Sequence, residues 1–200
     1  MEMYENKALM QGIIIRKSVT EMMGSLVLAT TKKGKDIKES NAPCICFFQN
    51  MKNELEKYEV GDFVCVEGEI QDYVDKNHQK RQSICAQSIH PAKSRIEELY
   101  GTEGGNLIEK KNEVRLIGTV SGIQDTEHVW NIFLRTVSGG RVHTIAVKLY
   151  KTKHTQEMGK SIQKCDSLCI IGSLQTKKRQ TERGLLFYEN VVAMEVSKLK

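Results

Sequence analysis

The chain has 200 residues, with 30 Lys and Arg, 25 Asp and Glu and two Pro, which fits one ordinary domain or two of about 100 residues. Its hydrophobic content of 40% and its mixed charges exclude a disordered chain. The longest apolar runs, as at 168–171, fall far short of the roughly 20 residues that a membrane-spanning helix needs. Because the first residues are acidic and polar, we expect no signal peptide, no membrane partner and a cytoplasmic location.

Five stretches of the first half are apolar or alternate with polar residues, which predicts five strands. These predicted strands cover residues 8–17, 25–31, 44–49, 63–74 and 81–90. Residues 51–58 are rich in Glu, Lys and Leu and end just before Gly61, which predicts the one helix of this half.

The second half repeats this order of elements. Its strands are predicted at 113–121, 129–137, 142–149, 167–177 and 185–196, with a helix at 153–163. Gly68 aligns with Gly172 at an offset of 104 (172 minus 68), and Gly12 aligns with Gly118 at an offset of 106 (118 minus 12). We therefore expect a first domain at 1–92, a Gly-containing linker at 93–111 with one helical turn near 94–100, and a second domain at 112–200.

Five strands with one helix between the third and the fourth is the order of the OB-fold, a small Greek-key barrel. Glycines inside the first and fourth strands suit the sharp bend of a strand that belongs to both sheets of such a barrel. The expected fold class is all-β with one short helix per domain, built as two tandem five-stranded OB-fold barrels.

The cysteines and histidines form no recognisable reactive or metal-binding motif. All six cysteines lie in strand-like stretches without a C-x-x-C pair, so we expect buried, reduced thiols and no metal site at Cys44, Cys46, Cys65, Cys85, Cys165 and Cys169. The histidines accompany no nucleophile motif or phosphate loop, and we expect side chains that face solvent or have an incidental role at His78, His90, His128, His143 and His154. We therefore expect neither an enzyme nor a cofactor.

Positive charge gathers in the second half of the chain. Residues 1–97 hold 14 basic and 14 acidic side chains, which leaves 16 basic and 11 acidic for residues 98–200. The cluster at 177–179, with Arg183 nearby, is typical either of a site for a polyanion or of a solvated hairpin tip.

Several segments resemble the single-stranded DNA-binding protein family of bacteria and phages. Residues 112–120, Asn-Glu-Val-Arg-Leu-Ile-Gly-Thr-Val, resemble its opening strand, and 171–177, Ile-Gly-Ser-Leu-Gln-Thr-Lys, its fourth strand. In the first half, 25–30 and 61–68 resemble its second strand and its turn into the fourth. The resemblance implies sequence-tolerant binding of single-stranded DNA in replication, recombination or repair, with bases stacked on aromatic rings. RNA stays open as a ligand, because stacking and phosphate contacts do not read the 2′-hydroxyl.

The resemblance implies that the second domain makes most of the contact. Its expected binding residues are cationic or aromatic, namely Trp130, Arg135, Lys148, Tyr150, Lys151, Lys177, Lys178, Arg179, Arg183 and Tyr188, with Tyr73 added from the first domain. Trp130 has a second interpretation, in which it covers the mouth of the barrel. Phe48 is a first-domain counterpart of the stacking aromatics, but we expect it in the core. Glu67 and Glu69 precede the first-domain hairpin and would repel phosphate, so we expect that domain to bind weakly or to serve in pairing.

The tandem arrangement also bears on partners. Chains of this family usually carry one barrel and a long acidic tail that recruits other proteins, whereas this sequence stops soon after its last predicted strand, so we expect no such recruitment. Two tandem chains are expected to pair as a homodimer. The alternative function is an OB-fold protein-interaction module of a replication, primosome or conjugation assembly, with little strand binding.

Overall fold

The computed structural model describes residues 4–31, 40–74, 78–92, 111–181 and 184–199. The helical turn expected near 94–100 lies outside these ranges. Within them, no helix combines the length and the apolar character that crossing a membrane requires.

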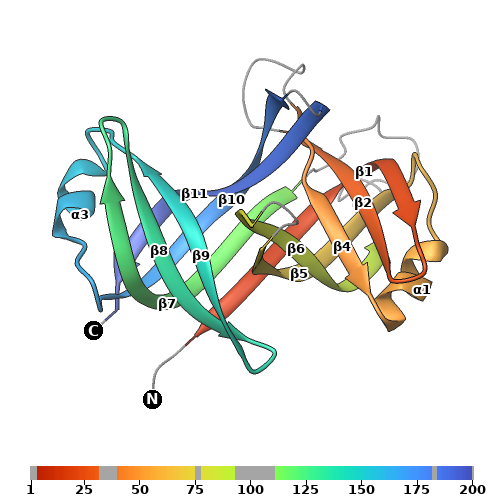
Figure 1. Ribbon diagram of the computed structural model, residues 1–200, viewed down its shortest axis with the longest axis horizontal. Helices are drawn as coiled ribbons and strands as arrows, with labels where there is room; N and C mark the ends of the chain where they lie inside the picture. Colours follow the sequence, from red (N-terminus) through yellow and green to blue (C-terminus); the bar gives the residue numbers. More distant parts are fainter. Residues whose placement is uncertain (1–3, 32–39, 75–77, 93–110, 182–183, 200) are drawn as a thin grey trace, which may run out of the picture. The chain divides into compact units, whose positions relative to one another are not determined.

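The first half folds into a closed five-stranded barrel with one helix (Figure 1). Its elements are β1 (Glu5–Val19), β2 (Met23–Thr31), β3 (Ser40–Asn41), β4 (Cys44–Phe48), α1 (Asn50–Glu56), β5 (Phe63–Val74) and β6 (Lys80–Pro91). The barrel order is β1, β2, β4, β6, β5 and back to β1, and the β4–β6 pair is parallel. The five predicted strands and the helix are confirmed, while the two-residue β3 was not expected.

The second half folds in the same way. Its elements are β7 (Lys111–Asp125), β8 (Val129–Ser138), β9 (Arg141–Tyr150), α3 (Gln156–Ser161), β10 (Ser167–Thr181) and β11 (Gly184–Lys198). The order is β7, β8, β9, β11, β10, with β10 pairing back to β7 and a parallel β9–β11 pair. The predicted fold class, two tandem OB-fold barrels with one short helix each, is confirmed.

The two barrels share one strand register. β1 pairs with β2, and β7 with β8, at a constant offset of 106 residues. Even the irregularity recurs, because the register shifts between Ile14 and Arg16 in β1 and between Val120 and Gly122 in β7. Such a bulge bends a strand and increases its twist, as a strand shared by two sheets of a barrel requires.

Glycine is required where the first strand of each barrel bends. A Cβ on Gly12 would lie 2.6 Å from the carbonyl oxygen of Ala29, and one on Gly118 would collide with the carbonyl oxygen of Arg135. Gly68 and Gly172, in the fourth strands, meet backbone carbonyls in the same way. The predicted role of these glycines at barrel bends is consistent with these contacts.

A tight turn leads into the fourth barrel strand of each half, which is β5 in the first half and β10 in the second. The N–H of Gly61 donates to the carbonyl of Ile14 at 2.8 Å, and the N–H of Cys165 donates to the carbonyl of Val120 at 2.9 Å. Both residues have a positive φ, 103° for Gly61 and 74° for Cys165. The prediction that Cys165 is a buried strand residue is wrong, because this cysteine is exposed and lies in the turn, at a conformation that costs an L-residue about 1–2 kcal/mol.

We expect Cys165→Gly to stabilise the protein by about 0.5–1 kcal/mol, because glycine relieves the positive φ but loses more entropy on folding. Urea unfolding followed by circular dichroism measures the change. Cys165→Ala is the control, since it removes the thiol and keeps the strain. Equal midpoints for the two variants would contradict this account of the turn.

The chain divides into two compact units that do not coincide with its two halves. One unit comprises Met1–Ala8, Glu69–Ser83 and Glu113–Lys200, and the other comprises Leu9–Gly68 and Ile84–Asn112. The start of β1, the end of β5 and the start of β6 therefore belong to the same unit as the second barrel.

Candidate nucleic-acid interface

The outward side of β8 and β9 carries three of the expected binding residues of the second barrel, Arg135, Lys148 and Tyr150. Inward residues such as Ile132, Leu134, Ile145 and Val147 are fully buried, so the residues between them face outward. Across this outward face, Asn131 pairs with Lys148, Phe133 with Ala146, Arg135 with Thr144, and Val129 with Tyr150. This register places Arg135, Lys148 and Tyr150 on one face of the sheet.

The side chains on this face differ in their exposure. Arg135 is exposed, and among the residues that the structure describes no carboxylate forms an ion pair with it. Phe133 and Lys148 are half-buried, and Tyr150 is 37% exposed at the end of β9. Along this face Tyr150, Lys148, Phe133 and Arg135 follow one another at successive outward positions. This alternation of rings and cations suits a ligand that alternates phosphates with bases.

The corresponding face of the first barrel lacks these cations. At the offset of 106, Ala29 replaces Arg135 and Val27 replaces Phe133. On the next strand, Cys46 lies opposite Ser25 as Lys148 lies opposite Asn131, so a thiol stands where the second barrel has an ammonium. The two barrels thus present the same backbone with different charge.

One aromatic position recurs in both barrels. Phe48 lies opposite Met23 as Tyr150 lies opposite Val129, and Phe48 is 47% exposed. The prediction that Phe48 belongs to the core is wrong, because Ile45 and Phe47 fill the inward positions of β4. Sequence reasoning weighed Phe48 as a stacking residue but favoured the core, although strict alternation along 44–48 places it outward.

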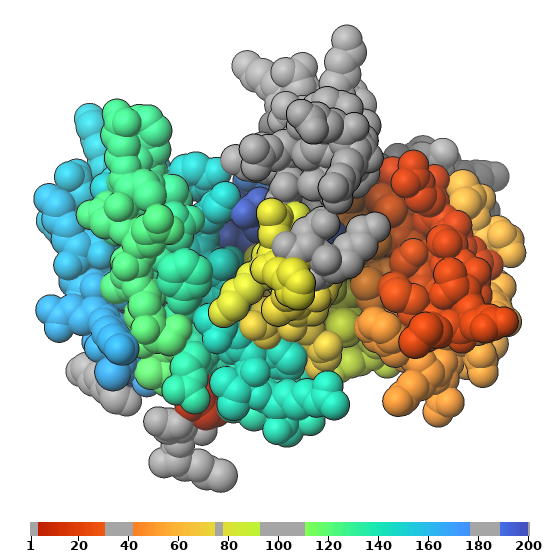
Figure 2. Space-filling view, in the orientation of Figure 1, coloured from red at the N-terminus to blue at the C-terminus, as the bar shows by residue number. Residues whose placement is uncertain are grey.

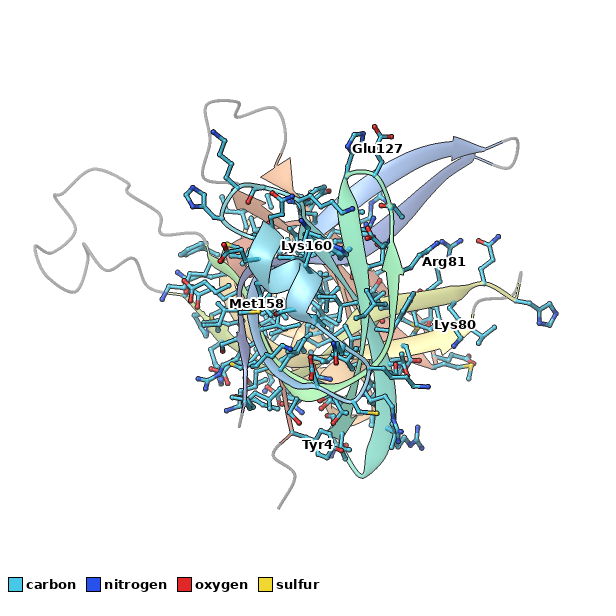
Figure 3. The ribbon with its side chains drawn as sticks, turned by 90° about the vertical axis from the view of Figure 1, so that its left-hand side faces the viewer. Tyr4, Lys80, Arg81, Glu127, Met158 and Lys160 are labelled. Carbon is cyan, nitrogen blue, oxygen red and sulfur yellow. The ribbon has the colours of Figure 1, made fainter. Side chains whose placement is uncertain are left out.

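Trp130 is a core residue, which corrects its assignment to the binding face. Its side chain points inward and is only 4% exposed. It lies under α3, where a Cβ on Gly159 would collide with the ring. The segment of α3 lies against strands of the second barrel in the space-filling view (Figure 2), and the helix with Met158 and Lys160 faces the viewer in Figure 3. A ring enclosed in this way offers no face to a base, so its other interpretation, that it closes the end of the barrel, holds.

Lys151 contacts the residues that close this end of the barrel. Its ammonium lies 4.8 Å from the centroid of the Trp130 ring and forms an ion pair with Asp125. A cation over a Trp face is stabilised by the ring quadrupole. Lys151 is therefore committed to the end of the barrel, and we leave it out of the proposed binding face.

The first barrel closes its end with the opposite combination of sizes. Gly24 occupies the strand position of Trp130 at the offset of 106, and Leu55 occupies the helix position of Gly159 at the offset of 104 (159 minus 55). A Cβ on Gly24 would lie 2.7 Å from Cδ2 of Leu55. One barrel thus has a large strand residue and a small helix residue, and the other has the reverse.

The basic hairpin of the second half is described only in its backbone. β10 and β11 pair through it in register, with Lys177 opposite Tyr188 and Lys178 opposite Phe187. The side chains of Lys177, Lys178, Arg179 and Tyr188 lie outside the described part of the structure, and Arg183 lies outside it altogether. Their predicted contacts stay predictions.

The hairpin of the first half makes polar contacts to the second barrel within their shared unit. The Asp72 carboxylate lies 3.0 Å from Nδ1 of His143. The Gln82 amide nitrogen donates to the carbonyls of Ala146 at 3.3 Å and Glu189 at 3.2 Å, and its oxygen accepts from the Ala146 N–H at 3.1 Å. These contacts join Asp72 and Gln82 of the hairpin to β9 and β11. The expectation that the first domain binds weakly or serves in pairing stays a prediction.

Four side chains lie on that hairpin or against it. Tyr73, a predicted binding residue, is 50% exposed on β5. Lys80 and Arg81 extend from the start of β6 (Figure 3). His143 was expected to face solvent, and this is wrong: it ends the inward row of β9 and is only 6% exposed.

The described part of the chain holds no group of three His, Cys, Asp or Glu side chains placed to bind a metal ion. Burial raises the pKa of the Cys65 thiol, and the Glu67 carboxylate raises it further, while Lys111 opposes both. Cys85 is buried as predicted, whereas Cys44, Cys46, Cys65 and Cys169 are only half-buried.

Comparison with known proteins identifies the fold. No protein-family model matches the chain, and no curated protein matches it significantly. Among solved structures, wild-type single-stranded DNA binding protein from Thermus aquaticus is 16% identical with a TM-score of 0.71, over 98% of this chain and 94% of that one. A deletion mutant of the same protein, which also carries an arginine-to-alanine substitution, is 18% identical with a TM-score of 0.71. This match covers 98% of this chain and 95% of that one. The chain therefore has, over nearly its whole length, the tandem OB-fold of the Thermus aquaticus single-stranded DNA binding protein.

Proposed function

We propose that the protein binds single-stranded DNA and that the second barrel makes most of the contact. The observation that carries this proposal is the outward face of β8 and β9, where Arg135 and Lys148 stand among Phe133 and Tyr150. The fold it shares with a single-stranded DNA binding protein supports the ligand class. A role in replication, recombination or repair, a cytoplasmic location and a homodimer of tandem chains belong to the same proposal.

The chemistry of this face suits a flexible polyanion. Arg135 and Lys148 neutralise phosphates, while the rings of Tyr150 and Phe133 offer surfaces on which bases stack, at about 1–3 kcal/mol per base. None of these groups reads a base edge in a fixed geometry, so binding tolerates many sequences. We extend the site to the hairpin cations Lys177, Lys178, Arg179 and Arg183 and to Tyr188.

The first barrel has a smaller part in this proposal. Phe48 and Tyr73 supply exposed rings, but the positions of Arg135 and Lys148 are taken by Ala29 and Cys46. The end of its hairpin is engaged by His143 and by the backbone of Ala146. We infer that it extends the path of the strand by stacking and adds little phosphate binding.

The test replaces the second-barrel cations by small uncharged residues, as Arg135→Ala with Lys148→Ser. We expect the affinity for labelled oligo-thymidine at low salt to fall about ten-fold or more, and the slope of log K against log salt to fall by about 1.4, at roughly 0.7 per lost phosphate contact. Fluorescence anisotropy at several salt concentrations measures both. Trp130 is buried, so its own fluorescence is a poor reporter of stacking.

The matched control is Lys153→Ala with Lys164→Ala, which removes the same charge from exposed positions near α3. Equal losses for the two double variants would contradict the assignment of the binding face. If the unaltered protein bound no oligonucleotide even at low salt, the proposed function would fail and the interaction-module alternative would take its place.

A further inference from the structure

Cys46 and Cys85 face each other across the junction that closes the first barrel. β4 and β6 pair there in parallel, with Ile45 opposite Ile84 and Cys46 opposite Cys85. Both isoleucines are fully buried inside the barrel. Because side chains alternate along a strand, the two thiols lie together on the outer side of this junction.

The spacing of this junction suits a disulfide. Neighbouring strands lie about 4.8 Å apart, and disulfides join residues whose Cα atoms are about 4.4–6.8 Å apart. Cys85 is 8% exposed and Cys46 is half-buried, so a small reagent reaches the pair from the side of Cys46. Both cysteines are thiols in the structure.

The other cysteines lack this arrangement. Cys44 lies opposite Val27, Cys169 lies opposite Ile117 and Ser197, and Cys165 lies in an exposed turn. The raised pKa of Cys65 keeps that thiol protonated and weakly reactive at neutral pH. At the matching junction of the second barrel, Lys148 lies opposite Val192, which is also 8% exposed.

We propose that Cys46 and Cys85 are a reversible redox pair whose disulfide cross-links the closing junction of the first barrel. The oxidant is a small-molecule disulfide. The Cys46 thiolate attacks it and displaces one thiol, and the Cys85 thiolate then attacks the mixed disulfide and displaces the second. The two cysteines lose two protons and two electrons and gain one S–S bond, while the small disulfide is reduced to two thiols. This proposal goes beyond strand binding and does not depend on it.

The test treats the full chain, without DNA, with glutathione disulfide and counts the remaining thiols by maleimide labelling and mass spectrometry. We expect the thiols of Cys46 and Cys85 to be lost, a cross-linked peptide pair containing residues 46 and 85, and a melting temperature raised by about 5 °C or more, all reversed by dithiothreitol. Cys46→Ser and Cys85→Ser should each abolish the cross-link. Cys44→Ser and Cys65→Ser should each leave it intact.

An engineered cysteine pair at the matching junction of the second barrel tests whether two cysteines in this register can form a disulfide. Lys148→Cys with Val192→Cys, in a chain that also carries Cys46→Ser, places two cysteines in the same register of the second barrel. The proposal would be overturned if this engineered pair cross-linked while the native pair, in the unaltered chain, stayed reduced. It would also be overturned if Cys46 of the unaltered chain stopped at a mixed disulfide with glutathione. Neither result would bear on DNA binding by the unaltered protein.

Discussion

Replacing Trp130 with Gly is expected to lower the free energy of unfolding by about 3–5 kcal/mol. The ring fills the end of the second barrel beneath α3, and its removal leaves a cavity there. Gly159→Leu alone is expected to destabilise by about 1–3 kcal/mol or more, because the new side chain enters the space of the ring. Urea unfolding followed by circular dichroism measures both losses.

The double variant, Trp130→Gly with Gly159→Leu, installs the arrangement that Gly24 and Leu55 form in the first barrel. We expect it to be more stable than either single variant, with a coupling energy of about 2 kcal/mol or more. The control combines Trp130→Gly with Leu55→Ala, which acts on the other barrel, so its two losses should add. If the losses caused by Trp130→Gly and by Gly159→Leu also simply added in their double variant, the fit between the large strand residue and the small helix residue would be disproved.

The second large effect is expected from Gly118→Ala, which should destabilise by about 3 kcal/mol or more. The added Cβ collides with the Arg135 carbonyl, an atom of the neighbouring strand that no side-chain rotation can move away. The loss should include the β7–β8 pairing on which the proposed binding face is built. Chemical unfolding and oligonucleotide binding of the same variant measure the two consequences.

Gly122→Ala is the matched control, in the same strand and only four residues further on. Its Cβ would meet nothing nearer than Cδ2 of Phe133 at 3.7 Å, which is an ordinary contact. We expect a change within about 1 kcal/mol in either direction. A control that lost as much stability as Gly118→Ala would show that any side chain in β7 is harmful and that the close approach is not the cause.

The strand order and the barrels could be predicted from the sequence because the information is local and occurs twice. Period-two alternation marks each strand, and an offset of 104 to 106 residues repeats the whole pattern. The recurring glycines Gly12 and Gly118 pointed to a bend, and the structure adds the reason that glycine is needed there, a backbone carbonyl of the adjacent strand where a Cβ would lie. A two-residue strand such as β3 is too short for any periodic signal.

The candidate site was less predictable, because it depends on contacts between distant residues. Nothing near Trp130 in the sequence shows that Gly159 makes room for its ring. His143 continues the inward row of β9, but its partner Asp72 lies 71 residues away in the sequence. The difference between Arg135 and Ala29, by contrast, was readable once the offset of 106 was known.

The inverted sizes beneath α1 and α3 have a consequence for folding. Tandem domains of similar sequence are prone to misassembly, in which a strand of one copy completes the barrel of the other. A hybrid barrel with Trp130 beneath Leu55 would have two large side chains in one space, and its counterpart with Gly24 beneath Gly159 would have a hole. Each helix therefore accepts only the strands of its own copy, so the chain discriminates against exchange between its repeats through side-chain volume, even though their backbone register is the same.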